Sequence, residues 1–185
     1  MSANARTISP VLRLGQLLLI TGGIQGRKKL QKIVHLLQAV GKVPFGYGFQ
    51  FSFYGPYSVD LKAEMDELAD EKLVIQEPFQ TQFGSPIYHF QLGPAMKRLL
   101  EDLKVSDEEE WTDLARQLNL KTAIELEGIS TVVFLQNVGW SGNELEEQFR
   151  TLKPKLEGDF EKYRAAALEL NDQTLGHGAA SYTVQ

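Results

Sequence analysis

Residues 20–38 read ITGGIQGRKKLQKIVHLLQ, and the glycines in this stretch predict a break between two helices. An apolar run, a glycine-rich turn and a basic residue before a helix are also the parts of a phosphate-binding loop. Such a loop needs four residues between its glycines, followed by Lys and a hydroxyl residue. Here three residues separate Gly22 from Gly26, and Arg27-Lys28 follows. The stretch is therefore interpreted as a turn between helices and not as a nucleotide site.

Helices are predicted on both sides of this turn. The first starts at Pro10, with Ser9 as its cap, and ends at Gly22. The second runs from Gly26 to Gly41 and contains a cluster of basic residues. Its apolar stripe consists of Leu30, Ile33, Val34 and Leu37.

Residues 45–53 show a period of two, because every odd position is aromatic and the residues between are small or polar. This alternation predicts that at least the latter half of the segment is extended, with one face buried. Residues 54–58, Tyr-Gly-Pro-Tyr-Ser, are typical of a turn. A third helix is predicted over residues 59–71, with Ser58 as its cap.

Two strands are predicted next, at residues 73–75 and 87–92, with residues 80–86 supplying the reversal of a hairpin. A fourth helix follows over residues 94–103. Helix, helix, helix and hairpin is the order of a winged helix-turn-helix domain. We therefore predict a winged helix-turn-helix-like N-terminal domain over residues 1–104.

The next part of the chain, residues 105–170, is predicted to be a C-terminal helical extension, which makes the fold class α+β and mainly helical. Ser106 with Glu109 has the spacing of a capping box at the start of its first helix. The tail, residues 171–185, is polar and Gly-rich and is predicted to be mobile or held only by a partner. The helices of the extension are predicted at residues 108–118, 120–136, 143–152 and 154–170.

The composition limits the class of protein. Apolar residues make up 43% of the 185 residues, which is enough for a hydrophobic core. There is no cysteine, so disulfides, thiolate metal sites and cysteine catalysis are excluded. Residues 1–6 lack the apolar core of a signal peptide, and apolar runs such as residues 17–20 are too short to cross a bilayer. We therefore expect a cytoplasmic protein with no membrane partner.

The net charge of −5 conceals an uneven distribution. Residues 1–59 contain 7 of the 19 basic residues and no acidic one, whereas the remaining residues hold 12 basic and all 24 acidic residues. One interpretation is a surface at the basic end for an acidic partner. The other is that the two parts attract each other across an internal interface.

No constellation of catalytic or metal-binding residues stands out in the sequence. The three histidines, His35, His89 and His177, are far apart, and none has a second ligand at metal-binding spacing. His35 lies between apolar residues and is predicted to be a half-buried helix residue. Ser141 lacks the spacing of a nucleophile elbow. We therefore predict a protein that is not an enzyme and that has no catalytic residue, metal site or cofactor.

Two motifs resemble those of a known family. Residues 26–32, Gly-Arg-Lys-Lys-Leu-Gln-Lys, and residues 54–58 resemble the helix and the turn that the YwgA-like family of uncharacterised bacterial and archaeal proteins carries. The similarity continues at residues 152–155 and spans most of the chain. A more distant similarity links the chain to the Panacea domain of SocA-like antitoxins. These antitoxins share a Lys-Leu-Gln-Lys helix that is followed by a Tyr-Gly-Pro segment.

The distant resemblance implies a function, whereas the close one implies none. The Panacea-like relatives are antitoxins that neutralise partner toxins, at least one of them as a proteolytic adaptor. We therefore expect a non-enzymatic regulatory protein-interaction module, antitoxin-like or adaptor-like, whose partner is a toxin or other effector. A homodimer formed through residues 120–136 is also considered, and the same apolar segment is equally suited to the core of the second half.

A DNA-binding transcriptional regulator is the alternative function. In winged helices the third helix normally enters the major groove. Here residues 58–71 carry six acidic residues and one basic residue, whereas phosphate contact needs cations at the interface. DNA would therefore bind through the basic second helix. Arg27 is expected to face a specific carboxylate or phosphate, because a cation at the start of a helix opposes the helix dipole.

The aromatic segment is a second candidate surface. Its tyrosines and phenylalanines suit a protein-binding hot spot, stacking on single-stranded bases, or a small-molecule site beneath the strand. The alternation favours instead a strand whose aromatic face packs into the core. Each lysine of the second helix could also form its solvated edge or pair with the acidic third helix. The candidate residues for binding a partner or nucleic acid are Arg27, Lys28, Lys29 and Lys32, with Tyr54 and Tyr57 expected nearest the surface.

Overall fold

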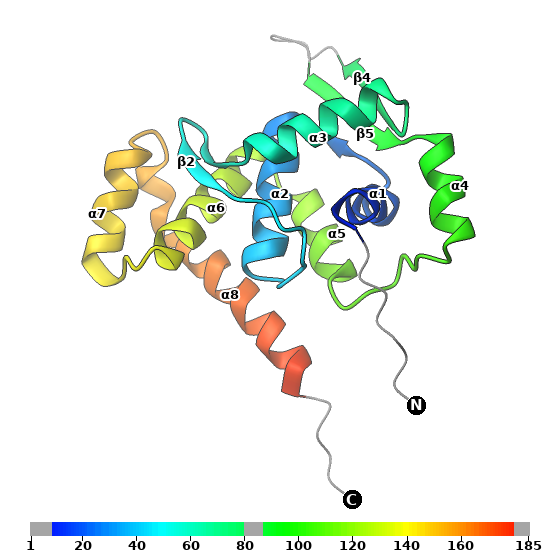
Figure 1. Cartoon of the computed structure of the whole chain (residues 1–185). Helices are drawn as coiled ribbons and strands as arrows, with labels where there is room; N and C mark the ends of the chain where they lie inside the picture. The colour runs from blue at the N-terminus through cyan, green and yellow to red at the C-terminus, as the bar shows by residue number, and fades with distance from the viewer. Residues whose placement is uncertain (1–8, 80–86, 180–185) are drawn as a thin grey trace, which may run out of the picture.

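The computed structural model describes residues 9–79 and 87–179, which form eight α-helices and two small antiparallel sheets (Figure 1). The fold class is therefore α+β and mainly helical, as predicted. Helix α1 (Pro10–Thr21) starts at the expected position, and the Ser9 side chain accepts a backbone hydrogen bond as its cap. The helix ends at Gly22, which adopts the left-handed conformation that glycine favours.

The turn after α1 contains a short strand that the sequence pattern does not reveal. Strand β1 (Ile24–Gln25) pairs antiparallel with β5 (Ile87–Leu92), and helix α2 (Arg27–Ala39) follows directly. Gly23 has a φ of 119°, and a Cβ at this position would lie 2.7 Å from the His89 Nε2 atom. Both the backbone conformation and the close approach to β5 therefore require glycine. A strand of two residues has no recognisable period, so the prediction of a simple turn is incomplete.

The predicted hairpin is present, and its strands belong to a three-stranded sheet in the order β1-β5-β4. Strand β4 (Val74–Phe79) pairs antiparallel with β5 and is longer than the predicted segment. The predicted reversal at residues 80–86 lies outside the described residues. Helices α3 (Val59–Asp70) and α4 (Pro94–Asp102) flank the hairpin in sequence, and Ser58 caps α3 as predicted.

The aromatic stretch has the predicted alternation in its first four members. Phe45 and Tyr47 are buried, Phe49 and Phe51 are partly buried, and the residues between these four are exposed. Phe53 is the exception, because its side chain is 83% exposed. The alternation therefore places most of the aromatic face against the core and leaves its last member in solvent.

A second hairpin begins within this stretch. Strand β2 (Gln50–Ser52) pairs antiparallel with β3 (Gly55–Tyr57), and Phe53 and Tyr54 form the loop between them. The predicted turn at residues 54–58 therefore contains a strand as well. Helix α3 begins directly after this β2–β3 hairpin.

The second half of the chain is helical, as predicted, but the predicted helix starts at residues 108 and 154 are wrong, because the helices there begin at Thr112 and Phe160. Ser106 and Glu109 do not form a capping box, because Ser106 Oγ accepts from the Glu108 amide and the Glu109 amide donates to Thr112 Oγ1. The Gln16 side chain donates to the Ser106 carbonyl at 2.6 Å and to the Glu109 carboxylate at 3.1 Å. A capping box occurs instead at the start of the next long helix, between Thr122 and Glu125. The helices are α5 (Thr112–Leu120), α6 (Ala123–Asn137), α7 (Gly142–Leu152) and α8 (Phe160–Ala179), with a 3-10 turn at Glu157–Asp159.

Helix α8 continues beyond the predicted end of the helical extension at residue 170. Residues 171–179 belong to this helix, so this part of the predicted tail is helical. Residues 180–185, the rest of the predicted tail, lie outside the described residues.

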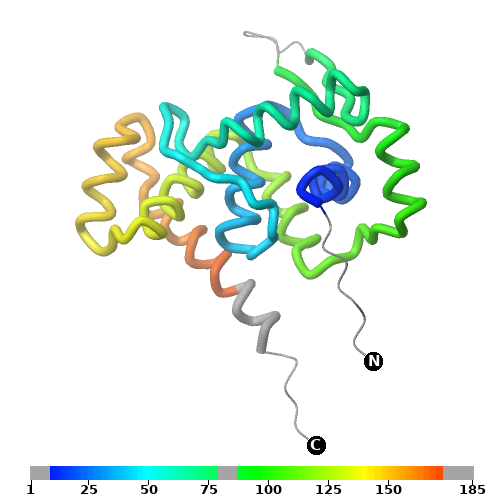
Figure 2. Tube along the Cα trace, viewed as in Figure 1, coloured from blue at the N-terminus to red at the C-terminus, as the bar shows by residue number. Residues whose placement is uncertain are grey.

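Helix α2 lies in the middle of the molecule, and α7 and α4 lie at opposite ends (Figures 1 and 2). Eight consecutive residues of α2, 30–37, are buried, so every face of this part of the helix is covered. Buried side chains from residues 1–104 and from residues 105–170 form one hydrophobic core. The apolar segment at residues 120–136 contributes to this core through α6, which favours the core interpretation over a dimer surface.

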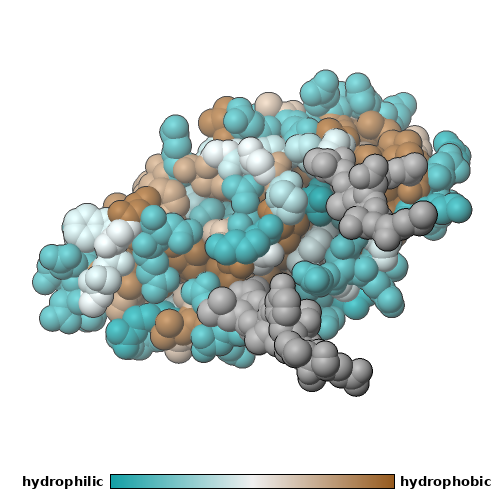
Figure 3. All heavy atoms as spheres, turned by 60° about the horizontal axis from the view of Figure 1, so that its bottom comes forward, coloured by the Kyte–Doolittle hydropathy of each residue, from teal (hydrophilic) through white to brown (hydrophobic). Residues whose placement is uncertain are grey.

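The surface is mixed in character. On the face shown in Figure 3, hydrophobic side chains gather in several patches among hydrophilic ones. Among the described helices, none combines the length and the apolar composition that crossing a bilayer requires.

Candidate functional site between α2 and the β2–β3 hairpin

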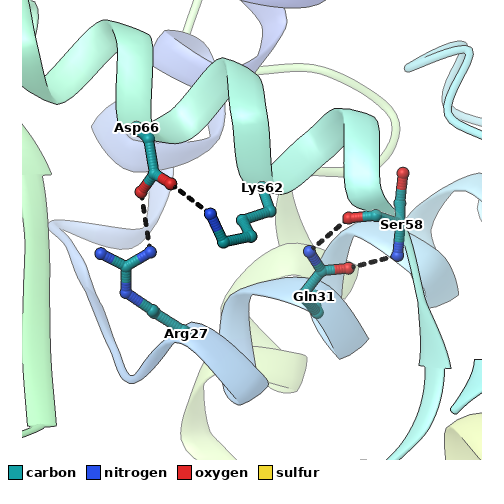
Figure 4. Close-up of polar contacts among 5 residues, drawn as sticks. All are labelled: Arg27, Gln31, Ser58, Lys62 and Asp66. Carbon is teal, nitrogen blue, oxygen red and sulfur yellow. Dashed lines mark hydrogen bonds and ion pairs between the residues drawn. The ribbon is translucent and has the colours of Figure 1, made fainter.

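Arg27, at the first position of α2, faces a carboxylate of the same chain. Its Nη1 atom donates to Asp66 Oδ1 at 2.7 Å, and Lys62 Nζ donates to Asp66 Oδ2 at 2.7 Å (Figure 4). The Arg27 Cζ atom also lies 4.8 Å from the ring centroid of Tyr88. The hydrogen bonds from Lys62 and Arg27 hold the pKa of Asp66 below its usual range. The acidic third helix therefore supplies the partner for this arginine.

The next two lysines have different neighbours. Lys28 is exposed, and its Nζ lies 3.1 Å from the ring centroid of Tyr54, which is a cation–π contact. Lys29 Nζ donates to the Asn119 carbonyl at 2.5 Å, and partial burial lowers the pKa of Lys29. Lys28 therefore belongs to the hairpin side of α2, whereas Lys29 connects α2 to the end of α5.

Lys32 is predicted to bind a partner at the surface, but it is buried, with only 2% of the residue exposed. Its Nζ donates to the Pro56 carbonyl at 2.5 Å. Burial lowers the pKa of Lys32 to about 7, and the Glu127 carboxylate partly offsets this effect. Helical spacing indicates which residues of α2 share a face, but not that neighbouring elements cover all of its faces.

Gln31 joins α2 to the end of the hairpin through two hydrogen bonds. Its Nε2 donates to the Ser58 carbonyl at 2.9 Å, and the Ser58 amide donates to Gln31 Oε1 at 2.9 Å (Figure 4). Lys32 holds Pro56 in the same segment. The helix motif therefore binds the Tyr-Gly-Pro-Tyr-Ser motif directly, and the two motifs share one structural role.

Lys153, which the sequence analysis missed, holds the hairpin from another side. Its Nζ donates to the Phe53 carbonyl at 2.7 Å and to Glu127 Oε1 at 2.6 Å, and its side chain is 4% exposed. Gly55 has a φ of 82°, and a Cβ there would lie 3.0 Å from Thr131 Oγ1, so the hairpin approaches α6 closely. The family resemblance around Lys153 is the sequence signal that points to it.

His35 is a buried core residue and not half-buried as predicted. Its Nδ1 lies 2.8 Å from Ser130 Oγ, and its ring makes an edge contact with Phe49 at 4.9 Å. Burial, with a smaller contribution from Lys32, lowers the pKa of His35 to about 3. Within residues 9–79 and 87–179, no group of three or more His, Asp or Glu side chains is arranged to hold a metal ion.

A cavity of about 250 Å³ lies between α2, α3 and the β2–β3 hairpin. It brings together five of the six predicted site residues, whereas Lys29 lies elsewhere. Four of the lining residues are basic and none is acidic, and apolar and neutral polar residues complete the wall. The cavity is lined by Arg27, Lys28, Leu30, Gln31, Lys32, Ser52, Tyr54, Gly55, Tyr57, Leu61, Lys62, Met65 and Phe90.

Phe53 and Tyr54 form the tip of the β2–β3 hairpin. Phe53 is 83% exposed and Tyr54 is 45% exposed, and their ring centroids lie 4.9 Å apart in an edge-to-face contact. Tyr57, which was expected near the surface with Tyr54, is half-buried. The period of two assigns Phe53 to the buried face, but the chain reverses at this residue. The exposed aromatic pair is therefore a feature that the alternation could not predict.

Comparison with known proteins extends the similarity beyond the two motifs. No protein-family model matches the chain. The chain is 30% identical over 148 residues to a protein of Bacillus subtilis (strain 168) named uncharacterized protein YwgA. The similarity covers 79% of this chain and 85% of that protein. The chain therefore belongs to the YwgA family.

Proposed function

We propose that the protein is a non-enzymatic regulatory module that binds another protein through the tip of the β2–β3 hairpin. The observation that carries this proposal is the exposed pair of Phe53 and Tyr54 on a hairpin whose backbone is held by the buried Lys32 and Lys153. Aromatic side chains dominate binding hot spots, and a backbone that is already ordered lowers the entropy cost of association.

The order of the N-terminal elements supports a winged helix-turn-helix-like arrangement. Three helices precede the β4–β5 hairpin, and the short strand β1 pairs with β5 at the edge of the sheet. In a winged helix-turn-helix, a turn of about three or four residues joins the second helix to the third. Here residues 40–58 separate α2 from α3 and contain the β2–β3 hairpin. The hairpin is therefore an addition to this arrangement, which supports a specific role for its tip.

The partner that we propose is a toxin or other effector protein with an acidic contact surface. The distant resemblance to SocA-like antitoxins supports the class of partner. The acidic character follows from Lys28, which is exposed and lies against the Tyr54 ring beside the tip. Complementary charge around an aromatic centre favours correct orientation and rapid association.

DNA binding through α2 has less support from the positions of the basic residues. Arg27 is paired with Asp66, and the Nζ atoms of Lys29 and Lys32 donate to backbone carbonyls. Nonspecific affinity for DNA depends on cations that can contact phosphates. Of the four basic residues that were proposed for DNA, three therefore already have partners inside the protein.

The test compares proteins captured from a native cell extract by the immobilised wild-type chain and by Phe53→Ala. Quantitative mass spectrometry should identify a protein that Phe53→Ala no longer retains. After purification of that protein, Phe53→Ala should weaken its Kd by a factor of about 30, because truncating a hot spot costs about 2 kcal/mol or more.

Leu99→Ala is the matched control, because Leu99 is an exposed large apolar residue on α4, at the other end of the molecule. This variant should capture the partner as the wild type does. Equal capture by the wild type and Phe53→Ala would exclude the hairpin tip as the contact surface. Binding of duplex DNA at low salt that Lys28→Gln weakens would favour the DNA-binding regulator instead.

A further inference from the structure

We propose that the cavity between α2, α3 and the β2–β3 hairpin binds a small organic phosphate, a phosphate monoester attached to a compact apolar group. This inference goes beyond the proposed function, because it concerns a small-molecule site. The two surfaces adjoin, because Lys28 and Tyr54 belong to both, whereas Phe53 does not line the cavity.

The lining of the cavity has an excess of positive charge. Arg27, Lys28 and Lys62 line it, and no acidic residue does. Lys32 also lines it, and its lowered pKa of about 7 leaves it only partly charged at pH 7. Asp66 bonds to Arg27 and Lys62, so one carboxylate is shared between two cations. A phosphate monoester carries a charge of about −1.5 to −2 at pH 7, and it offsets this excess better than a carboxylate does.

The cavity also offers hydrogen-bond donors that suit a phosphate group. The Arg27 guanidinium has five N–H groups in a fixed plane, and one nitrogen serves Asp66. Lys28 and Lys62 are exposed, so their ammonium groups can turn toward a bound anion. Tyr57 lines the same space with a hydroxyl. Arginine and lysine together are a common combination for binding phosphate.

One part of the cavity wall is apolar and buried. It is formed by Leu30, Leu61, Met65 and Phe90. The volume of about 250 Å³ exceeds that of a cavity of about 150 Å³ that can hold benzene. It lies just below the lower limit of about 300 Å³ for the pockets that take larger ligands. The space therefore fits one ring or a short chain beside the charged group.

Isothermal titration calorimetry on the full chain with four small probes tests the proposal. Phenyl phosphate combines both features, inorganic phosphate and benzyl alcohol each have one, and benzoate replaces the dianion with a monoanion. Phenyl phosphate should bind about tenfold more tightly than inorganic phosphate, because burial of the ring is worth at least about 1.4 kcal/mol. It should also bind more tightly than benzoate, and benzyl alcohol should give no measurable heat.

Two double variants with the same change in net charge locate the site. Lys28→Gln with Lys62→Gln removes two exposed cations from the cavity and should weaken phenyl phosphate binding about tenfold. Lys97→Gln with Lys155→Gln removes two exposed lysines that do not line the cavity, and it should leave the Kd unchanged.

Several outcomes would overturn the proposal. These are the absence of phenyl phosphate binding at millimolar concentration, an affinity no higher than that for inorganic phosphate, tighter binding of benzoate, and equal weakening by the two double variants. Phe53→Ala should bind phenyl phosphate as the wild type does. The loss of this small-molecule site and the loss of protein capture can therefore be observed separately.

Discussion

At the scale of single residues, Lys32 and Lys153 determine how the β2–β3 hairpin is held. Lysine is rarely buried unless it is paired, and here each ammonium group donates to a backbone carbonyl of the hairpin. The sequence could predict that Lys32 belongs to a family motif. It could not predict burial, because burial depends on α6 and on the hairpin, which lie far away in the sequence. For the same reason Lys153 was missed.

Replacing Lys32 with Met should change how stability depends on pH. The pKa of Lys32 is lowered from 10.5 to about 7 in the folded protein. Between these values the unfolded chain binds a proton that the folded chain does not, so wild-type stability decreases as the pH falls. The free energy of unfolding of the wild type, relative to Lys32→Met, should therefore rise from pH 7 toward pH 10. The slope should reach at most about 1.4 kcal/mol per pH unit.

Urea unfolding at several pH values measures this difference. Lys97→Met is the control, because Lys97 is exposed on α4, and this variant should follow the pH dependence of the wild type. A difference between the wild type and Lys32→Met that stays constant from pH 7 to pH 10 would contradict the assignment.

At the scale of elements, α6 and α8 pack closely because Gly128 has no side chain. A Cβ on Gly128 would lie 2.5 Å from a ring atom of Tyr163 on α8. The sequence predicted most of both helices, since their signals are local. It did not predict this contact, nor the strands β1 and β3, which are too short to show a period. The capping box at Thr122 and Glu125 is a local signal too, because its spacing is present in the sequence.

Gly128→Ala should destabilise the protein by about 1–3 kcal/mol, because the ring of Tyr163 must move. Alanine is a better helix former than glycine by about 1 kcal/mol, so propensity alone predicts the opposite sign. Chemical denaturation measures the change. Gly48→Ala should have little effect, since no atom lies within 4 Å of a Cβ at that position. Tyr163→Leu should remove most of the cost of Gly128→Ala, and equal costs in both backgrounds would refute this explanation.

At the scale of the whole molecule, the core crosses the predicted boundary at residue 104. The rings of Phe45 and Trp111 lie 6.3 Å apart, and Lys29 donates to the Asn119 carbonyl. A boundary prediction rests on composition and element order, whereas a shared core is a property of the folded chain.

A fragment ending at residue 104 should therefore fail to form a stable fold. Without α5 and α6 the buried residues of α2 lose much of their cover, which exposes apolar surface that the rest of the fragment cannot bury. Amide dispersion in a two-dimensional NMR spectrum distinguishes the two states, with the full chain as the reference. A well-dispersed spectrum from the fragment would show that the first segment folds independently.

Ion pairs within the chain involve only some of the basic residues that cluster before residue 60. Among the described basic residues before residue 60, Arg27 pairs with Asp66, whereas Lys29, Lys32 and Lys42 donate to backbone carbonyls. The internal-interface interpretation is therefore correct for Arg27. For the three lysines, the partners are dipoles of the backbone, which the sequence does not reveal.

The paired hydrogen bonds between Gln31 and Ser58 have a consequence for evolution within the family. Replacing Gln31 leaves the buried amide and carbonyl of Ser58 without these hydrogen bonds. Both groups belong to the backbone, so they are present whatever residue occupies position 58. Selection should therefore preserve the side chain at position 31, whereas at position 58 it should mainly preserve the backbone conformation. Position 58 can be substituted by other residues that cap α3. Position 31 cannot be substituted unless another donor and acceptor replace those of the glutamine side chain.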